Sequence, residues 1–226
     1  MATLKSPVFA YDSPRPLVTT DMVIFTLQHQ RLEVLLQRAG GPQPGQWALP
    51  GGGVGIAEDL EASARRQLRE ETGVAGLYLE QLYTFGAPAR DPRDRVISVA
   101  YYALIPPDKL QRQNEHRAGA AWFPFEELPI LPLDQAEIAA NARERLVAKL
   151  HYSTIALQFM APEFTLSELQ QVYETILQAP LDKRNFRKSV LAMQQIEETG
   201  AERRNGAHRP ARLYRVRQPG RVEIIR

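Results

Sequence analysis

The chain of 226 residues is 44% hydrophobic and 24% charged, which is typical of a globular protein and allows one large domain or two modest ones. It contains no cysteine, which excludes disulfides, zinc–thiolate centres and thiol nucleophiles, and its 4 histidines lack the spacing of metal ligands. The net charge of +2 is unevenly divided, because residues 181–226 carry 12 Lys or Arg against 5 Asp or Glu, and a basic, foldable end indicates an anionic partner.

The first elements are strands. Residues 1–16 include three prolines and predict an irregular lead-in. Residues 17–27 (LVTTDMVIFTL) predict a strand, and residues 32–37 predict its hairpin partner across a polar turn at residues 29–31. A Gly/Pro-rich loop is expected over residues 38–46, after which residues 47–50 (WALP) lead into a glycine-rich turn.

A glycine-rich segment followed by a helix is the most informative stretch, and residues 52–74 read GGVGIAEDLEASARRQLREETGV. Gly51, Gly52, Gly53 and Gly55 predict a loop whose backbone N–H groups approach phosphate oxygens closely. The helix expected over residues 58–72 turns by about 100° per residue. One face of it then carries Gln67, Glu70 and Glu71, beside an apolar stripe of Leu60, Ala64 and Leu68.

The ends of this helix are also legible. Arg66 lies four residues before Glu70, which is close enough to hold that carboxylate. Gly73 stands where a helix cap adopts a left-handed conformation. Carboxylates beside a phosphate-binding loop suit a hard cation such as Mg²⁺.

This stretch resembles the Nudix box, and it matches at Gly52, Glu58, Arg66, Leu68, Glu70, Glu71, Gly73 and Val74. The resemblance implies a Nudix α/β/α sandwich with a mixed sheet, and it leaves Glu70 and Glu71 as the ligands of any Mg²⁺. Where the family has a further glutamate, this chain has Gln67. A neutral carboxamide is a poorer Mg²⁺ ligand, so we expect a site that binds a diphosphate and cleaves it badly, with no competent catalytic residue. An active hydrolase that tolerates Gln67, and a residue introduced to trap a ligand, are the alternatives.

Two strands are expected after the box, over residues 77–85 and 96–105. The segment between them, with the strand that follows it, resembles the branch of the Nudix family directed at ADP-ribose and its regulator relatives. Arg90, Arg93 and Arg95 can hold phosphate or carboxylate groups, although Asp91, Arg93 and Asp94 can equally pair to fix a loop. The residues expected to bind the nucleotide are Gly51, Gly52, Arg66, Glu70, Glu71, Arg90 and Arg93.

A domain boundary is expected in the proline-rich residues 124–132. The next helix is expected over residues 134–150, where Asp134 and Glu137 have the spacing of a capping box and Ile138, Ala142, Leu146 and Leu150 form a stripe. We therefore divide the chain into an effector-binding domain (residues 1–132), a linker helix (133–152) and a C-terminal domain (153–226).

The C-terminal domain has a helix-turn-helix pattern. Thr165 and Glu168 have capping-box spacing and start a helix that runs to about residue 177. A second helix is expected over residues 182–199, with Gly200 as its stop and with Phe186, Val190, Met193 and Ile196 as its buried side.

The second helix begins with cations, although positive charge in a first turn opposes the helix dipole by about 0.3–1 kcal/mol each. This placement suits a helix that reads DNA, and a β-hairpin wing is expected to follow it. The alternative is a protein-interaction module with a basic face. The residues expected to contact DNA are Lys183, Arg184, Asn185, Arg187 and Lys188 in the helix and Arg203, Arg204, His208 and Arg209 in the wing.

The whole chain resembles the Nudix-related transcriptional regulators of NAD metabolism, on the box, on RDPRDRVISVAYYAL, on LDKRNFRKSV and on RPARLYRV. The resemblance implies a homodimeric repressor that binds ADP-ribose or a related nucleotide and a palindromic double-stranded DNA operator. The rival hypothesis is an active Mg²⁺-dependent ADP-ribose pyrophosphatase with a dimerising C-terminal domain, and a third is a nucleotide-binding scaffold for protein partners. No signal peptide or apolar membrane span is evident, so we expect a cytoplasmic protein without a membrane partner.

Overall fold

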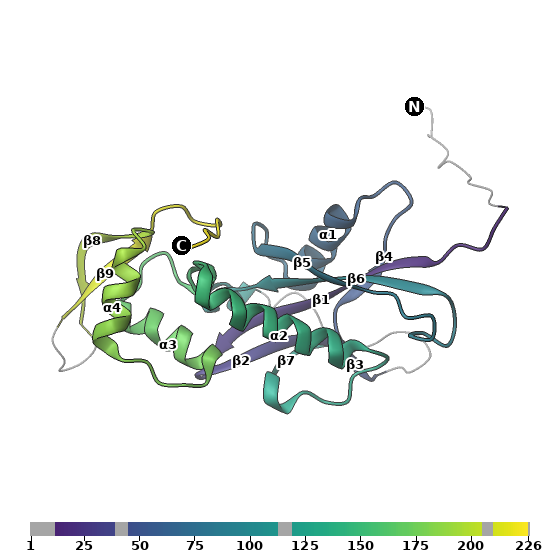
Figure 1. Cartoon of the computed structure of the whole chain (residues 1–226), viewed down its shortest axis with the longest axis horizontal. Coiled ribbons are helices and arrows are strands. Elements are labelled where there is room, and N and C mark those ends of the chain that lie inside the picture. The colour runs from purple at the N-terminus through teal and green to yellow at the C-terminus, as the bar shows by residue number, and fades with distance from the viewer. Residues whose placement is uncertain (1–11, 39–44, 113–118, 205–209, 226) are drawn as a thin grey trace.

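The computed structural model describes residues 12–38, 45–112, 119–204 and 210–225, which form an N-terminal α/β unit and a C-terminal helical unit joined by one long helix (Figure 1). A mixed sheet forms the centre of the first unit and has seven strands among these residues, with β1 and β6 parallel and the other neighbours antiparallel. The order is β3-β2-β1-β6-β5, while β4 pairs with β1 and β7 with β2. The strands are β1 (Leu17–Gln28), β2 (Arg31–Arg38), β3 (Trp47–Ala48), β4 (Gly51–Gly53), β5 (Tyr78–Phe85), β6 (Val96–Leu104) and β7 (Ala120–Pro124).

Two helices cover opposite faces of this sheet, because successive side chains of a strand point to opposite sides. Helix α1 (Leu60–Thr72) packs on the face that includes Met22 and Ile24, whereas α2 (Gln135–Tyr152) packs on the face of Val23 and Phe25. The result is the Nudix sandwich with a mixed sheet that the sequence predicts. Short 3₁₀ turns η1 (Pro107–Arg112) and η2 (Phe125–Glu127) connect its later elements.

The expected strand pair and box helix are confirmed, with differences at their edges. The hairpin turn is two residues, His29 and Gln30, both in the left-handed region with φ of 49° and 60°. Gly73 ends α1 in the left-handed conformation with φ of 66°. The expected glycine loop is wrong for Gly51–Gly53, which form strand β4, because pairing with β1 satisfies their backbone groups.

Helix α2 is confirmed, but the expected capping box at its start is wrong. Asp134 occupies the N-cap position and its side chain makes no capping hydrogen bond. The reason is a competing partner, because its carboxylate accepts two hydrogen bonds from Arg90 instead.

The C-terminal unit is a winged helix domain. After η3 (Ile155–Phe159) it has α3 (Leu166–Leu177), α4 (Lys183–Ala192) and an antiparallel hairpin of β8 (Ile196–Arg203) with β9 (Ala211–Val216). Thr165 and Glu168 form the expected capping box, and the hairpin is the expected wing. Gly206, His208 and Arg209 lie outside the described residues.

The second helix is shorter than expected. It ends at Ala192, and residues 196–203 form a strand. The stripe of Phe186, Val190 and Ile196 is buried as expected, but Ile196 reaches the core from a strand paired with Val216. Long-range pairing with β9 thus overrides a local helical pattern, and Gly200 with φ of 82° stands within β8, where the register shifts.

One hydrophobic cluster runs through both units. It extends from Phe25 in β1 through Ala142 and Leu150 of α2 to Phe159 and Phe186. Helix α2 is therefore packed into both units at once. Within the described residues, no helix has the length and apolar character needed to cross a membrane.

Candidate functional site

The backbone of strand β4 lies unusually close to that of strand β1 at Gly51. A Cβ added to Gly51 would lie 2.4 Å from the carbonyl oxygen of Thr20, whereas one added to Gly53 would meet nothing within 4 Å. Gly51 is thus required for the close pairing of β4 with β1. The same pairing uses part of the backbone hydrogen-bonding capacity that the sequence assigned to phosphate.

Arg66 is held between two carboxylates of the box. Its Nε and Nη2 donate to Glu58 at 2.8 and 3.0 Å, and its Nη1 lies 3.3 Å from an oxygen of Glu70. The hydrogen bonds from Arg66 lower the pKa of Glu58 to about 2. The expected Arg66–Glu70 contact is present, and the additional contact with Glu58 ties the helix to the segment before it.

Gln67 is buried and its carboxamide is bonded inside the protein. Thr20 Oγ1 donates to its Oε1 at 2.9 Å, and its Nε2 donates to Ser63 Oγ at 3.2 Å. The neutral side chain therefore satisfies both of its polar atoms without any ion.

Glu70 and Glu71, the remaining carboxylates on this helix face, have different surroundings. Glu70 is exposed beside Arg66, whereas Glu71 is buried, where the amide of Gln37, with its nitrogen turned towards it, donates at 3.1 and 3.3 Å. Across the described ranges, no three His, Cys, Asp or Glu side chains are grouped so that they could hold a metal ion. The donors present thus do not fit the Mg²⁺ site that the Nudix box implies, and no chemical step is assigned to such an ion.

A cavity of about 850 Å³ opens beside β4, and we call it the β4 pocket. Four of the residues expected to bind the nucleotide line it, namely Gly51, Gly52, Arg90 and Arg93. Arg66, Glu70 and Glu71 are not part of its lining, although Gln37, which bonds to Glu71, is. Of the residues expected to bind the nucleotide, four therefore line the pocket and the other three lie on helix α1 outside its lining.

The arginines of the pocket are paired with acidic residues. Arg93 bonds to Asp91 through its backbone N–H and its guanidinium, which lowers the pKa of Asp91 to about 2. Arg90 donates from Nε and Nη2 to the two carboxylate oxygens of Asp134 at 2.8 and 2.6 Å. The loop-fixing alternative is therefore observed for Arg93, and Asp94 accepts from the backbone N–H of Arg95.

Sequence reasoning missed two polar residues that line this pocket, Asp21 and Gln135, and it missed Asp134 as the partner of Arg90. Asp21 is buried, which raises its pKa, and it accepts hydrogen bonds from Ser98 and, at 3.1 Å, from Gln135 Nε2. It is the single charged residue in the apolar run of residues 17–27, which is a signal the sequence offered.

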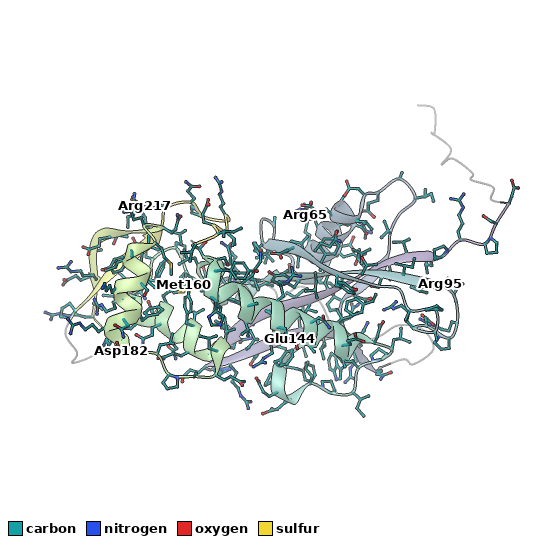
Figure 2. All side chains as sticks on the ribbon, viewed as in Figure 1. Arg65, Arg95, Glu144, Met160, Asp182 and Arg217 are labelled. Carbon is teal, nitrogen blue, oxygen red and sulfur yellow. The ribbon has the colours of Figure 1, made fainter. Side chains whose placement is uncertain are left out.

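The candidate nucleic-acid face lies on α4, in the C-terminal unit where Figure 2 labels Asp182, at the far end of the long axis from Arg95. Asp182 caps the helix by accepting from the backbone N–H of Asn185 at 2.8 Å. The cations that follow are exposed, and among the described residues none of them forms an ion pair with a carboxylate within 4.0 Å. These cations are Lys183, Arg184, Arg187 and Lys188.

Two of the expected wing cations, Arg203 and Arg204, lie in the described residues. Arg203 donates to Glu168 at 2.8 Å and to the carbonyl of Glu163 at 3.1 Å, so its guanidinium fixes the hairpin against α3. Arg204 is exposed.

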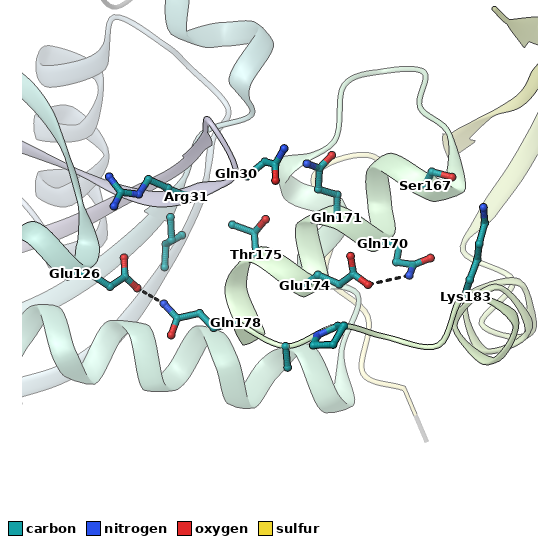
Figure 3. A pocket seen from close by; sticks show the side chains of 13 residues that line it. Gln30, Arg31, Glu126, Ser167, Gln170, Gln171, Glu174, Thr175, Gln178 and Lys183 are labelled. Atoms are coloured by element: carbon teal, nitrogen blue, oxygen red, sulfur yellow. Dashed lines mark hydrogen bonds between the residues drawn. The ribbon is translucent and has the colours of Figure 1, made fainter. Parts of the chain in front are cut away.

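A groove of about 830 Å³ separates the turn of the β1–β2 hairpin from α3 and the start of α4, and Figure 3 shows it from close by. Its walls are polar, with Gln170, Gln171 and Gln178 on one side and Arg31 and Glu126 on the other. A hydrogen bond from Gln178 to Glu126 crosses between the two units. The units are therefore in direct contact on this side as well.

Comparisons with known proteins match both units. The NUDIX domain model matches residues 16–146, and the NrtR DNA-binding winged helix domain model matches residues 156–216. The chain is 41% identical over 209 residues to the ADPR responsive transcriptional repressor NtrR of Acinetobacter baylyi, covering 90% of this chain and 83% of the relative.

Solved structures are similar to the whole chain and to its first unit. The structure of Shewanella oneidensis NrtR complexed with a 27mer DNA matches with a TM-score of 0.81 and 36% identity, covering 88% of this chain and 93% of that one. The NUDIX domain of the same protein complexed with ADP ribose matches with a TM-score of 0.51 and 37% identity, covering 60% of this chain and 94% of that one.

Proposed function

We propose, because the chain belongs to the Nudix family and carries the NrtR DNA-binding winged helix domain, that it is an ADP-ribose-responsive transcriptional repressor of NAD metabolism genes. The observation that carries this proposal is the exposed cationic face of α4, whose side chains form no ion pair with a carboxylate among the described residues. Cations at a helix N-terminus destabilise the fold, and contacts with the phosphates of DNA offset this cost.

The β4 pocket is the proposed ADP-ribose site. It is large enough for a dinucleotide-sized ligand, and Gly51, Gly52, Arg90 and Arg93 offer backbone and guanidinium groups to a diphosphate. The other expected nucleotide-binding residues would contact the ligand from helix α1, namely Arg66, Glu70 and Glu71. ADP-ribose is the effector in this proposal, and no other cofactor is required.

The Nudix unit is proposed to sense rather than to hydrolyse. With Gln67 bonded to Thr20 and Ser63, position 67 offers no carboxylate to a cation beside Glu70 and Glu71, and Mg²⁺ catalysis depends on such ligands. Residual pyrophosphatase activity is the second candidate function. It predicts steady Mg²⁺-dependent turnover of ADP-ribose by the native chain, at a rate far below that of a complete box.

The DNA partner is proposed to be a palindromic operator bound by a homodimer, in which each α4 enters one major groove. Lys183, Arg184, Asn185, Arg187 and Lys188 would face base edges and phosphates, and Arg204 would reach the backbone from the wing. Arg203 is held by Glu168, so we give it a structural role instead.

The test is a duplex selected by the native protein from a random library and then titrated by fluorescence anisotropy. Affinity should fall by about 10³–10⁵ between 50 and 200 mM salt if six to ten phosphates are neutralised. Saturating ADP-ribose should change that affinity, by about 5–150-fold for a typical effector. A protein that retains no duplex at low salt would refute the proposal.

A further inference from the structure

We infer that the ion pair between Arg90 and Asp134, which we call the latch, reports occupancy of the β4 pocket to the DNA-binding domain through helix α2. The inference rests on the proposed function and adds the residue through which it is regulated. Asp134 is a positioning residue here, whereas Arg90 is the group that meets the ligand.

One member of the latch, Arg90, lines the β4 pocket, and it pairs with Asp134 in matched geometry. Arg90 donates to both oxygens of Asp134, its side chain is only 3% exposed, and its Nη2 lies 3.6 Å from Asp21. Phosphate offers the same two-oxygen fork as a carboxylate, so a phosphate that binds the Nε–Nη2 edge of Arg90 must displace Asp134 from it. A diphosphate ligand in the β4 pocket therefore competes directly with Asp134.

The carboxylate of Asp134 has an alternative set of partners at the start of helix α2. It is the N-cap residue of α2, yet its side chain makes no capping bond while Arg90 holds it. Aspartate is among the preferred N-cap residues because its carboxylate accepts from the first free N–H groups of the helix. A carboxylate released from Arg90 can therefore bond to the free N–H groups of α2. The start of the helix then has two arrangements, one with Asp134 bonded to Arg90 and one with Asp134 capping the helix, and the carboxylate has a partner in both.

The residue before the cap stores strain. Leu133 lines the β4 pocket and has a φ of 54°, a left-handed conformation that a leucine rarely adopts. Such a conformation persists where neighbouring contacts enforce it. The backbone hydrogen bond from Gln135 to Pro132 closes the turn around Leu133, and the next residue is Asp134 of the latch. Opening the latch would let this hinge relax.

Helix α2 carries the change across the molecule. It has 18 residues and so spans about 27 Å, from the pocket to the winged helix domain (Figure 1). Beside the latch, Gln135 accepts from the backbone N–H of Leu49 and donates to Asp21. At the other end, the backbone of Tyr152 accepts from Ile225 and that of Thr154 donates to Glu223.

The packing makes α2 move as a unit. Its stripe of Ile138, Ala142, Leu146 and Leu150 is buried in the same hydrophobic cluster as Phe159 and Phe186. Close-packed interiors do not deform continuously, so a shift at one end of the helix repositions what is packed on the other. A two-state contact at the pocket then biases the orientation of α4.

The decisive variant is Asp134→Asn, which removes the charge that pairs with Arg90 and keeps the ability to cap. Its matched control is Glu137→Gln, which removes the same charge from the same first turn at an exposed position. ADP-ribose affinity is measured by calorimetry, and the affinity for the selected duplex by anisotropy with and without saturating ADP-ribose.

We expect Asp134→Asn without ligand to bind DNA as the native protein does with ligand. The effect of ADP-ribose on DNA affinity should fall from about 5–150-fold to less than about twofold. ADP-ribose should bind the variant more tightly, by the same factor that DNA affinity has shifted, because the competitor has been removed. The control should keep the native values of all three quantities.

A second variant, Asp134→Ala, breaks the pair and cannot cap. It should lose the coupling as well, but bind ADP-ribose less tightly than Asp134→Asn does, and equal affinities would refute the capping step. A native-sized response to ADP-ribose in either folded variant would overturn the latch. If the native protein itself shows no response, the proposed function fails instead, so the two failures are distinguishable.

Discussion

Glu80→Gln is the substitution that most directly tests how α2 is fixed to the Nudix sheet. Glu80 lies in β5 and accepts hydrogen bonds from Lys149 and Tyr78, from Tyr102 at 3.0 Å and from Arg145 at 3.1 Å. Lys149 and Arg145 come from the last turns of α2. One carboxylate therefore joins the far end of the helix to the sheet.

The magnitude follows from what a glutamine would lose. A hydrogen bond to a charged group contributes about 1.5–3 kcal/mol, and the amide can still accept from the hydroxyls but cannot neutralise two cations. The side chains of Glu80 and Lys149 are 21% and 17% exposed, so solvent screens part of the pairing. We expect a loss of about 2–3 kcal/mol in the free energy of unfolding, which lowers the thermal midpoint by about 4–12 °C in a chain of this size.

The assay is urea and thermal unfolding of the full chain beside Glu144→Gln, a matched charge removal at an exposed position of α2. Burial raises the pKa of Glu80, but the hydrogen bonds from Lys149, Tyr78 and Tyr102 lower it by more, so the net shift is downward from 4.5. A depressed pKa means that the stabilisation is complete above pH 4.5 and is lost as pH falls through the lower, folded-state value. The difference between native and Glu80→Gln should shrink in that window. Equal midpoints for the two variants at pH 7, or a gap that widens in acid, would refute the reasoning.

Three further outcomes are expected. Arg184→Ala should weaken binding of the selected duplex at least tenfold, as measured by anisotropy, with ADP-ribose affinity unchanged in calorimetry; equal loss of both would indicate unfolding. Gln67→Glu should raise Mg²⁺-dependent hydrolysis of ADP-ribose by at least about tenfold in a product assay, because a carboxylate then stands at position 67 beside Glu70 and Glu71, and an unchanged rate would show that the site lacks more than one ligand. Gly51→Ala should destabilise the fold by about 1–3 kcal/mol, because its Cβ would lie 2.4 Å from the carbonyl oxygen of Thr20, whereas Gly53→Ala meets nothing within 4 Å and should leave the urea midpoint nearly unchanged.

Local signals in the sequence were sufficient for most elements. The box helix with its Gly73 cap, the capping box at Thr165 and the hairpin wing all depend on spacing within a few residues, and all are present. The end of α4 could not be read in this way. Ile196 satisfies a helical stripe as well as a strand, and only its pairing with Val216, 20 positions away in the chain, decides between them.

The partners of charged residues were also beyond local reasoning. Arg90 and Asp134 are 44 residues apart, and Arg203 and Glu168 are 35 apart. Spacing says nothing of such pairs, so the sequence assigned both arginines to ligands. The sequence predicts that Asp134 caps α2, but Arg90 competes for the same carboxylate. A predicted local contact that is absent for this reason indicates a side chain that can exchange one partner for another.

The neutral residue at position 67 has a consequence for what the pocket measures. A cluster of carboxylates on one helix face repels itself, so it is stable mainly when a cation is bound, and its ligand affinity then depends on that cation. Gln67 removes this dependence, because its amide is satisfied by Thr20 and Ser63 whether or not an ion is present. Arg93 in the wall of the β4 pocket is likewise held by an internal pair, with Asp91. A site built in this way is organised before its ligand arrives, and the energy of binding can act on the latch instead of on assembling a metal centre.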